Sequence, residues 1–241
     1  MNDEDLAPSD GHRSSFIVYR SLVRWAFARF YREFAWMYDT VAGAVSGGRW
    51  GAWGQATLPY LRGRVLELGC GTGNLQQALA PQCDLWAVGL DASPQMLAIT
   101  RRKLAAAGQS GNLARAVAQA LPFSATSFDS IVATFPTEYI IDLATLAELR
   151  RVVRPGGRVV VALAAAFSSD GLYQRLVDLL YRATLQRSPR EQPLDSPVSL
   201  LGVRLAELGF TVVERWESVA NNQVHLVIAE CSAFPNGKAE D

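Results

Sequence analysis

The segment from Val65 to Leu75 reads VLELGCGTGNL, and it constrains the fold more than any other part of this chain. Its apolar run predicts a buried strand, and Gly69, Gly71 and Gly73 predict a tight turn from that strand into a helix. Glycine tolerates positive φ and has no Cβ, so a ligand can approach the backbone closely at such a turn. The segment therefore predicts a nucleotide-type ligand at the carboxyl end of a first strand.

Glu67 and Asn74 discriminate among nucleotide ligands. The dinucleotide pattern GxGxxG needs a glycine three residues after Gly71, where this chain has Asn74, and no GK[ST] follows to make a Walker A loop. A carboxylate just before the loop would repel a pyrophosphate but attract a cationic amino group. S-adenosylmethionine has no phosphate and carries an ammonium and a sulfonium. The pattern E-x-G-x-G-x-G therefore favours S-adenosylmethionine as the ligand.

A second acid, Asp91, follows the expected second strand, Leu85–Leu90. At that position an adenosine ribose would meet a carboxylate that accepts its hydroxyl protons. Ala92 and Met96 come next, and they are placed for apolar contact with the adenine. Asp91 could also be a solvent-facing turn residue or a helix cap. Together with Glu67 and the three glycines, however, it favours a ribose contact.

Strands and helices alternate from residue 64 onward, which predicts an α/β fold with a mainly parallel sheet. A helix at about Arg49–Leu61 is expected to precede the first strand. Residues 166–197 break the alternation and are interpreted as a lid or substrate-binding insertion. A helix at 200–208 and a closing hairpin at 210–216 and 224–230 are expected to follow. The remaining expected strands are 65–68, 85–90, 113–117, 128–134 and 158–163, and the remaining helices are 74–79, 94–107 and 142–153.

Composition limits the other function classes. The chain has 241 residues, enough for one sizeable α/β domain at 49–232, flanked by an N-terminal tail and aromatic helical cap at 1–48 and a tail at 233–241. The formal net charge is zero, which gives no basic footprint for nucleic acid. Three cysteines without CxxC spacing and two histidines argue against a metal site and for a reducing compartment. We expect a cytoplasmic protein without a membrane span.

Several motifs in order resemble class I S-adenosylmethionine-dependent methyltransferases, and within them the type 11 group of ubiquinone/menaquinone C-methyltransferase-like enzymes. The resemblance covers about Leu61–Leu163. It implies a Rossmann-like three-layer sandwich with a seven-stranded sheet of order 3-2-1-4-5-7-6 and strand seven antiparallel. The motifs that carry it are VLELGCGTGNL, VGLDAS (88–93), ALPF (120–123), SFDSIVAT (127–134) and LRRVVRPGGRVVVA (149–162).

The resemblance also implies roles for site residues. Glu67 would hold the methionine amino group, and the loop from Gly69 through Asn74, which includes Cys70, would shape the methionine pocket. Where the family often has an acid, this chain has Val117. Gln119 or main-chain groups of residues 118–121 would then hold the adenine amino group. The residues with implied cofactor contacts are Glu67, Gly69, Cys70, Gly71, Gly73, Asn74, Asp91, Ala92, Met96, Gln119, Ala120 and Thr134.

No catalytic base is obvious. Methyl transfer from a sulfonium is an in-line displacement, so the protein mainly aligns the reactants and excludes water. Glu138 and Tyr139 follow the expected fourth strand and could reach a substrate, but a helix-start acid and a packing aromatic explain them equally well. Tyr38 either covers the cofactor or packs in the core. His225 is expected to be a core or edge residue.

The aromatic segment at residues 14–38 has three interpretations: a helix packed over the domain, a hydrophobic lid over a lipophilic substrate, or a membrane-surface helix. We expect a small, apolar or amphipathic methyl acceptor. Two alternatives stay open at this point. One is a non-catalytic S-adenosylmethionine-binding or scaffold protein. The other is a nicotinamide oxidoreductase, which Glu67 and Asn74 disfavour.

Overall fold

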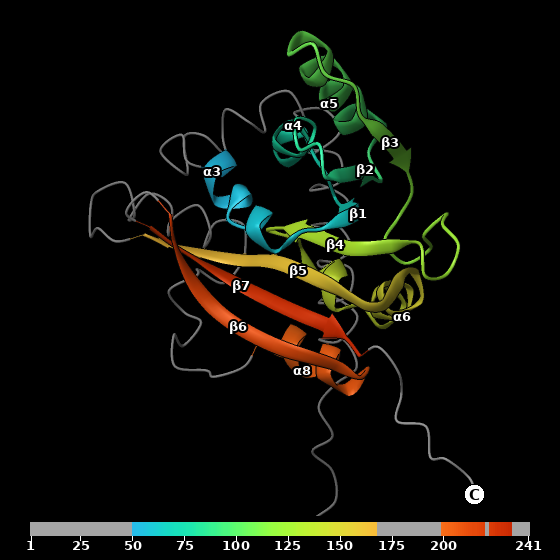
Figure 1. Ribbon diagram of the computed structural model, residues 1–241, viewed down its shortest axis with the longest axis vertical. Coiled ribbons are helices and arrows are strands. Elements are labelled where there is room, and N and C mark those ends of the chain that lie inside the picture. Colours follow the sequence, from blue (N-terminus) through green and yellow to red (C-terminus); the bar gives the residue numbers. More distant parts are fainter. Residues whose placement is uncertain (1–49, 168–198, 220–221, 233–241) are drawn as a thin grey trace, which may run out of the picture. The chain divides into compact units, whose positions relative to one another are not determined.

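Seven strands of the described residues form one sheet in the order β3-β2-β1-β4-β5-β7-β6 (Figure 1). The computed structural model describes residues 50–167, 199–219 and 222–232, all within the unit Asp39–Asp241. Strand β7 runs antiparallel to β5 and β6, so the expected sheet order and direction are confirmed. The strands are β1 Gly63–Leu68, β2 Leu85–Asp91, β3 Asn112–Arg115, β4 Phe128–Thr134, β5 Val153–Phe167, β6 Phe210–Val219 and β7 Asn222–Cys231.

Helices cover both faces of this sheet (Figure 1). Val65, Val132 and Val160 point to the face that carries α3 and α4, while their neighbours in the strands point to the face that carries α6 and α8. Strands buried on both faces need continuous apolar runs, which is what the sequence supplies. The helices are α3 Trp50–Gln55, η2 Leu58–Tyr60, α4 Asn74–Leu79, α5 Pro94–Ala106, η3 Glu138–Ile141, α6 Leu143–Val152 and α8 Leu200–Glu207, where η marks a 3-10 helix.

The strand register brings the loops of interest together. Leu68, the last residue of β1, pairs with Leu90 of β2 on one side and with Ala133 of β4 on the other. The glycine loop after β1 therefore lies between Asp91 at the end of β2 and Thr134 at the end of β4. This is the carboxyl edge of the parallel strands, where α/β sheets bind their ligands.

The expected helix over 49–61 is divided, which corrects the prediction. Helix α3 ends at Gln55 and η2 follows at Leu58–Tyr60. The Thr57 hydroxyl donates to the Gly54 carbonyl (2.8 Å), and the Thr57 N–H donates to the same carbonyl (3.2 Å), which is a 3-10 pattern. Pro59 has no N–H to continue an α-helix. These local bonds end α3 six residues before Leu61.

Strand β5 is longer than expected at both ends. It begins at Val153, which pairs with Phe128 of β4. The next pair is Arg158 with Ser130, so the register between β4 and β5 shifts across the RPGG residues 154–157. Strand β5 also continues through residues 166 and 167, the first two of the expected insertion, which pair with residues 223 and 222. The rest of that insertion, the N-terminal segment 1–48 and the tail from 233 lie outside the described residues.

Two further predictions are confirmed with small changes at their ends. Ser93 caps α5 by accepting the Met96 N–H (3.3 Å), and Pro94 begins the helix. The hairpin of β6 and β7 is antiparallel and extends three residues beyond the expected end of β6 at Trp216. None of the helices in the described ranges is long and apolar enough to cross a bilayer.

Candidate functional site

The three glycines of the loop have positive φ, but each faces a different neighbour. A Cβ on Gly69 would lie 2.8 Å from the Tyr139 hydroxyl oxygen, and a Cβ on Gly73 would lie 2.5 Å from Cγ2 of Thr100. Among the described residues, a Cβ on Gly71 would meet nothing closer than the Gly69 carbonyl oxygen at 3.9 Å. Gly73 therefore allows α4 and α5 to pack closely, whereas Gly71 leaves space on the side where a ligand would approach.

Asp91 ties the loop to the start of α5. One carboxylate oxygen accepts the Gly71 N–H (2.9 Å), and the other accepts the Ser93 N–H (2.8 Å). Burial raises the pKa of Asp91, although these N–H groups lower it in part. Ala92 is exposed beside it and Met96 is buried. Asp91 is thus a turn residue and also lies beside the glycine loop, because its one carboxylate bonds to the backbone of both segments.

Glu67 is buried, with 1% of its surface exposed. The Gln76 side-chain amide donates to its carboxylate (2.7 Å). Burial raises the pKa of Glu67 to about 8; the Gln76 amide opposes this rise, and the charge of Asp91 adds to it. In the described part of the chain, the charge that acts on the Glu67 carboxyl is thus the negative charge of Asp91. Gln76 was not found from the sequence, although a glutamine between the core-facing Leu75 and Leu79 is a signal that could have indicated it.

Cys70 lies in the same loop with its side chain buried. Its N–H donates to the Leu90 carbonyl (2.9 Å), which joins the loop to β2. Burial, with the neighbouring Glu67 and Asp91 charges, raises the pKa of the Cys70 thiol far above its usual range. The thiol therefore stays protonated and contributes packing rather than nucleophilic chemistry.

Asn74 makes its described contacts with other protein groups. Its side-chain oxygen accepts from the Lys103 ammonium (2.8 Å), and its amide donates to Thr72 (3.4 Å). Nearby, the Thr100 hydroxyl donates to the Gly71 carbonyl (2.7 Å). These bonds connect the glycine loop and α4 to α5, so they hold the loop in its positive-φ conformation.

On the expected adenine side, Gln119 is half-buried and its amide donates to Asp142 (3.2 Å). Asp142 also caps α6 by accepting the Ala144 N–H (2.9 Å). Val117 is 47% exposed and Ala120 is exposed. The structure therefore places Gln119 and the exposed Ala120 on the loop between β3 and β4, where the Gln119 side chain is bonded to Asp142 at the start of α6.

An ion pair on α6 fixes the rest of this loop. Glu148 accepts the Leu121 N–H (2.6 Å), and the Arg151 guanidinium donates to the carbonyls of Leu121 (3.1 Å) and Phe123 (2.7 Å). The Arg151 guanidinium also pairs with Glu148 (2.6 Å) and lowers the pKa of that carboxyl. The loop that follows β3 is thus held in one conformation before any ligand arrives.

An aromatic group lies at the carboxyl end of β4. Phe135, which follows Thr134, has φ 49°, a left-handed conformation that is strained for an aromatic residue. Its N–H donates to the Ala162 carbonyl (2.7 Å), and its ring lies 4.6 Å from that of Trp50 at 42°. Strained residues of this kind cluster at functional sites. Neither Phe135 nor Trp50 was predicted from the sequence, in which the one local signal is that Phe135 precedes a proline and so has a restricted backbone.

The two candidate base residues differ in position. The Tyr139 hydroxyl donates to the Leu68 carbonyl (3.3 Å), so its ring lies beside the glycine loop. Glu138 is exposed and begins η3, as a helix-start acid would. Tyr38 lies outside the described residues.

His225 lies on β7 opposite Ala164 of β5, and its side chain has a structural partner. Its Nε2 lies 2.8 Å from a Glu214 carboxylate oxygen, and its ring stacks on Trp216 at 4.8 Å. Glu214 also accepts from the N–H and the hydroxyl of Ser199. These contacts connect the β6–β7 hairpin to the start of α8. In the described part of the chain, no three His, Cys, Asp or Glu side chains are grouped as metal ligands.

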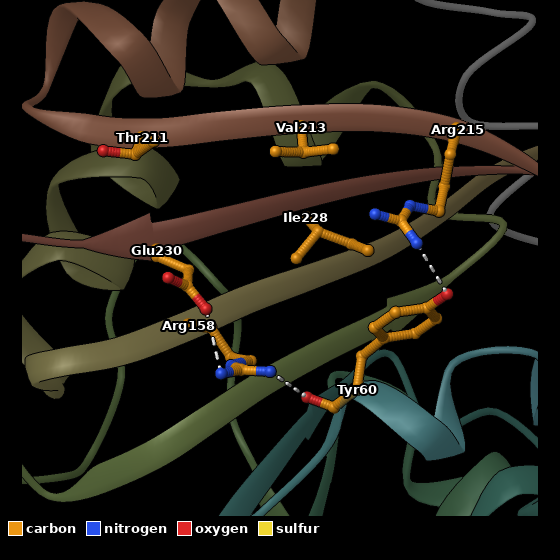
Figure 2. A pocket seen from close by; sticks show the side chains of 7 residues that line it. All are labelled: Tyr60, Arg158, Thr211, Val213, Arg215, Ile228 and Glu230. Atoms are coloured by element: carbon orange, nitrogen blue, oxygen red, sulfur yellow. Dashed lines mark hydrogen bonds and ion pairs between the residues drawn. The ribbon is translucent and has the colours of Figure 1, made fainter.

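A shallow pocket of about 250 Å³ lies on the outer strands, toward the amino ends of the parallel strands (Figure 2). Arg158 pairs with Glu230 (2.9 Å) and donates to the Tyr60 carbonyl (3.3 Å), while Tyr60 donates to Glu217 (2.5 Å). These bonds attach η2 to the sheet, and we assign the pocket no part in the ligand site. Its lining residues are Tyr60, Arg158, Thr211, Val213, Arg215, Ile228 and Glu230.

The residues at the carboxyl edge suit a ligand that is cationic and bears hydroxyl groups. Burial raises the pKa of both Glu67 and Asp91, so a positive charge beside them would favour their ionised forms. Asp91 already accepts two N–H groups but has lone pairs left for hydroxyl donors. The space at Gly71 admits a close approach. These properties fit S-adenosylmethionine and disfavour a pyrophosphate.

Comparisons with known proteins identify relatives of this chain. Residues 65–157 match the family model described as a methyltransferase domain. The chain is 43% identical over 102 residues to the demethylmenaquinone methyltransferase of Thermus thermophilus, covering 41% of this chain and 46% of that protein. It is 34% identical over 168 residues to the demethylmenaquinone methyltransferase of Roseiflexus castenholzii, covering 64% of this chain and 70% of that one.

The matches span less than two thirds of the length of the first curated relatives. The fold is similar to that of the PH0226 protein from Pyrococcus horikoshii OT3, with a TM-score of 0.58, 20% identity, and coverage of 85% of this chain and 99% of that one. At that identity the likeness concerns the fold alone.

Proposed function

Because this chain belongs to the class I S-adenosylmethionine-dependent methyltransferase family, in the group that includes the demethylmenaquinone methyltransferases, we propose that it transfers a methyl group to a small lipophilic or aromatic acceptor. The observation that carries the proposal is the grouping of Glu67, the open Gly71 and Asp91 at one edge of the sheet. S-adenosylmethionine, when bound, supplies a methyl group on a sulfonium, an already activated leaving group.

The residues divide the work of binding. Glu67 offers a negative charge to the methionine ammonium, and the Asp91 carboxylate accepts hydrogen bonds from the ribose hydroxyls. Asp91 can do this without moving, since the Gly71 and Ser93 N–H groups already fix its carboxylate. Gln119, Ala120 and their main-chain neighbours border the adenine, and Met96 supplies apolar surface behind it. Preorganised groups of this kind lower the cost of ordering the site on binding.

The acceptor belongs to the quinol class in this proposal. Relatives are named for demethylmenaquinone, and the aromatic rings of Trp50 and Phe135 at the end of β4 support a planar, apolar acceptor. Attack by a ring carbon needs a base to remove a proton. Glu138 and Tyr139 are the candidates for that step because both follow β4, and the Tyr139 hydroxyl lies beside the glycine loop.

Calorimetry and a turnover assay test the proposal. The wild-type chain should bind S-adenosylmethionine, and Asp91→Ala should weaken binding at least about tenfold while the fold persists, because a charged hydrogen-bond partner is lost. Asp84→Ala is the matched control, since Asp84 is exposed near the other end of β2. Unchanged affinity in Asp91→Ala would overturn the ribose assignment.

Radiolabelled methyl transfer to quinol, phenol and amine acceptors then tests catalysis. We expect label on the quinol, with S-adenosylhomocysteine as the second product. Tight cofactor binding without transfer to any acceptor would instead favour a non-catalytic binding protein.

The aromatic segment at residues 14–38, which lies outside the described residues, is proposed to contact a membrane surface from which a lipophilic acceptor would come. Flotation with liposomes should then be lost when residues 1–40 are removed. Equal flotation of both chains would remove this part of the proposal.

A further inference from the structure

We propose that Gln76 is a positioning residue that orients the Glu67 carboxylate toward the ammonium group of S-adenosylmethionine. The inference rests on the proposed function, because it assigns a residue to the same ligand. Gln76 belongs to α4 and Glu67 to β1, and their side chains meet under the glycine loop.

The geometry of this pair is fixed by burial. The Gln76 amide nitrogen lies 2.7 Å from a Glu67 carboxylate oxygen, and the two residues are 2% and 1% exposed. A buried amide and a buried carboxylate that pair with each other satisfy groups that would otherwise destabilise the fold. The amide also limits the directions in which the carboxylate can point.

Gly89 makes room for Gln76. It is the β2 residue directly opposite Glu67 in the strand register. A Cβ at Gly89 would lie 2.9 Å from Cδ of Gln76 and 3.0 Å from a methyl of Leu113. The glutamine side chain therefore fills a slot that only a glycine in β2 leaves open. Three elements, β1, β2 and α4, build this arrangement together.

Electrostatics give the amide a function beyond filling space. In the described part of the chain, the titratable groups that act with Glu67 are Asp91 and the Cys70 thiol, and the Asp91 charge disfavours a second negative charge nearby. The Gln76 amide acts in the opposite direction, because it donates a hydrogen bond to the ionised form. Without that donor, Glu67 would hold its proton to higher pH, so a smaller fraction of it would be ionised at a given pH below about 9.

Gln76→Met tests this, because methionine has similar length and no donor. The dissociation constant of S-adenosylmethionine is measured by calorimetry from pH 6 to 9.5 in the wild type, Gln76→Met and Gln77→Met. Gln77 is the matched control, since it is exposed on the same helix. Titration of the ligand's own amino group is common to all three proteins and cancels in the ratio of dissociation constants.

The expected result is a ratio that depends on pH. Loss of a hydrogen bond to a charged group should raise the Glu67 pKa by about one unit or more, so Gln76→Met should bind roughly tenfold more weakly than wild type at pH 6 to 7. The ratio should approach one at the highest pH, where Glu67 is ionised in both proteins. A purely structural role would give a ratio that does not change with pH.

Each outcome has a defined meaning. If the wild type binds and the ratio is constant with pH or equal to one, the positioning role is wrong while the proposed function stands. If the wild type does not bind S-adenosylmethionine, both are wrong. Should Gln76→Met fail to fold, Gly89→Ala keeps the glutamine but displaces it, and it should produce the same pH-dependent loss. A constant ratio in Gly89→Ala would equally overturn the inference.

Discussion

Gly73→Ala should destabilise the protein more than Gly108→Ala, although both glycines have positive φ. The φ of Gly73 is +82°, and an L-residue in that region costs about 1–2 kcal/mol. The new Cβ would also lie 2.5 Å from Cγ2 of Thr100, so α5 must shift, at about 1–3 kcal/mol for an overpacked contact. The free energy of unfolding should therefore fall by about 2–5 kcal/mol.

Gly108→Ala is the matched control for the free-energy cost of placing an L-residue at positive φ. Its φ is +67°, and an added Cβ would meet no atom of the described residues within 4 Å. It should lose only the backbone cost, about 1–2 kcal/mol. Urea unfolding of the full chain measures both variants, with the slope of each transition checked against wild type. Equal losses in Gly73→Ala and Gly108→Ala would refute the packing explanation.

Thr100→Ser isolates the clashing methyl. Serine keeps the hydroxyl that donates to the Gly71 carbonyl (2.7 Å) but lacks Cγ2. In a double-mutant cycle, Thr100→Ser should recover about 1 kcal/mol of the Gly73→Ala loss, a typical coupling for residues in contact. Additive effects of the two substitutions would show that the methyl is not what excludes a side chain at residue 73.

Two further predictions concern charge. Glu67→Gln should remove a pH dependence of stability. The pKa of Glu67 is about 8 in the folded protein and 4.5 ordinarily, so the protonated side chain contributes fully to wild-type stability below pH 4.5. That contribution falls as the pH rises to 8. Relative to the variant, the wild-type free energy of unfolding should drop by roughly 3–4 kcal/mol from pH 5 to 8, and parallel urea-unfolding profiles would contradict this. Arg151→Ala should release the loop at Leu121 and Phe123, because it removes the donors to their carbonyls. S-adenosylmethionine binding should weaken about threefold to tenfold, and the free energy of unfolding should fall by about 1–2 kcal/mol. Unchanged affinity by calorimetry would show that the loop does not border the ligand.

The sequence predicted the sheet well because its signals are local. The runs at β1, β2 and β4 are mostly apolar, and a glycine, an acid or a threonine stands at or directly after their carboxyl ends. The order of the outer strands came from the family resemblance, since no local pattern places β7 between β5 and β6.

Three features that the sequence did not indicate depend on particular contacts made in the folded chain: the divided helix, the Gln76–Glu67 pair and the left-handed Phe135. The division of the helix at 49–61 arises from Thr57 bonding to Gly54 and from Pro59, although the composition suits one helix. Gln76 reaches Glu67 only because Gly89 is opposite it, and the sequence separates these residues. The left-handed Phe135 is held by a bond to Ala162 of β5, which no pattern around Phe135 could indicate.

The position of β7 has a consequence for how the chain is made. β7 follows β6 in the sequence, yet it lies between β6 and β5 in the sheet and pairs Leu226 with Ala162. During synthesis from the N-terminus, β5 therefore emerges with one edge lacking its partner until residue 231 has left the ribosome. Val159 to Val161 are completely buried in the finished fold, so a nascent or truncated chain exposes a β-branched edge that can pair with another chain. Protection of that edge during translation is a requirement set by topology alone.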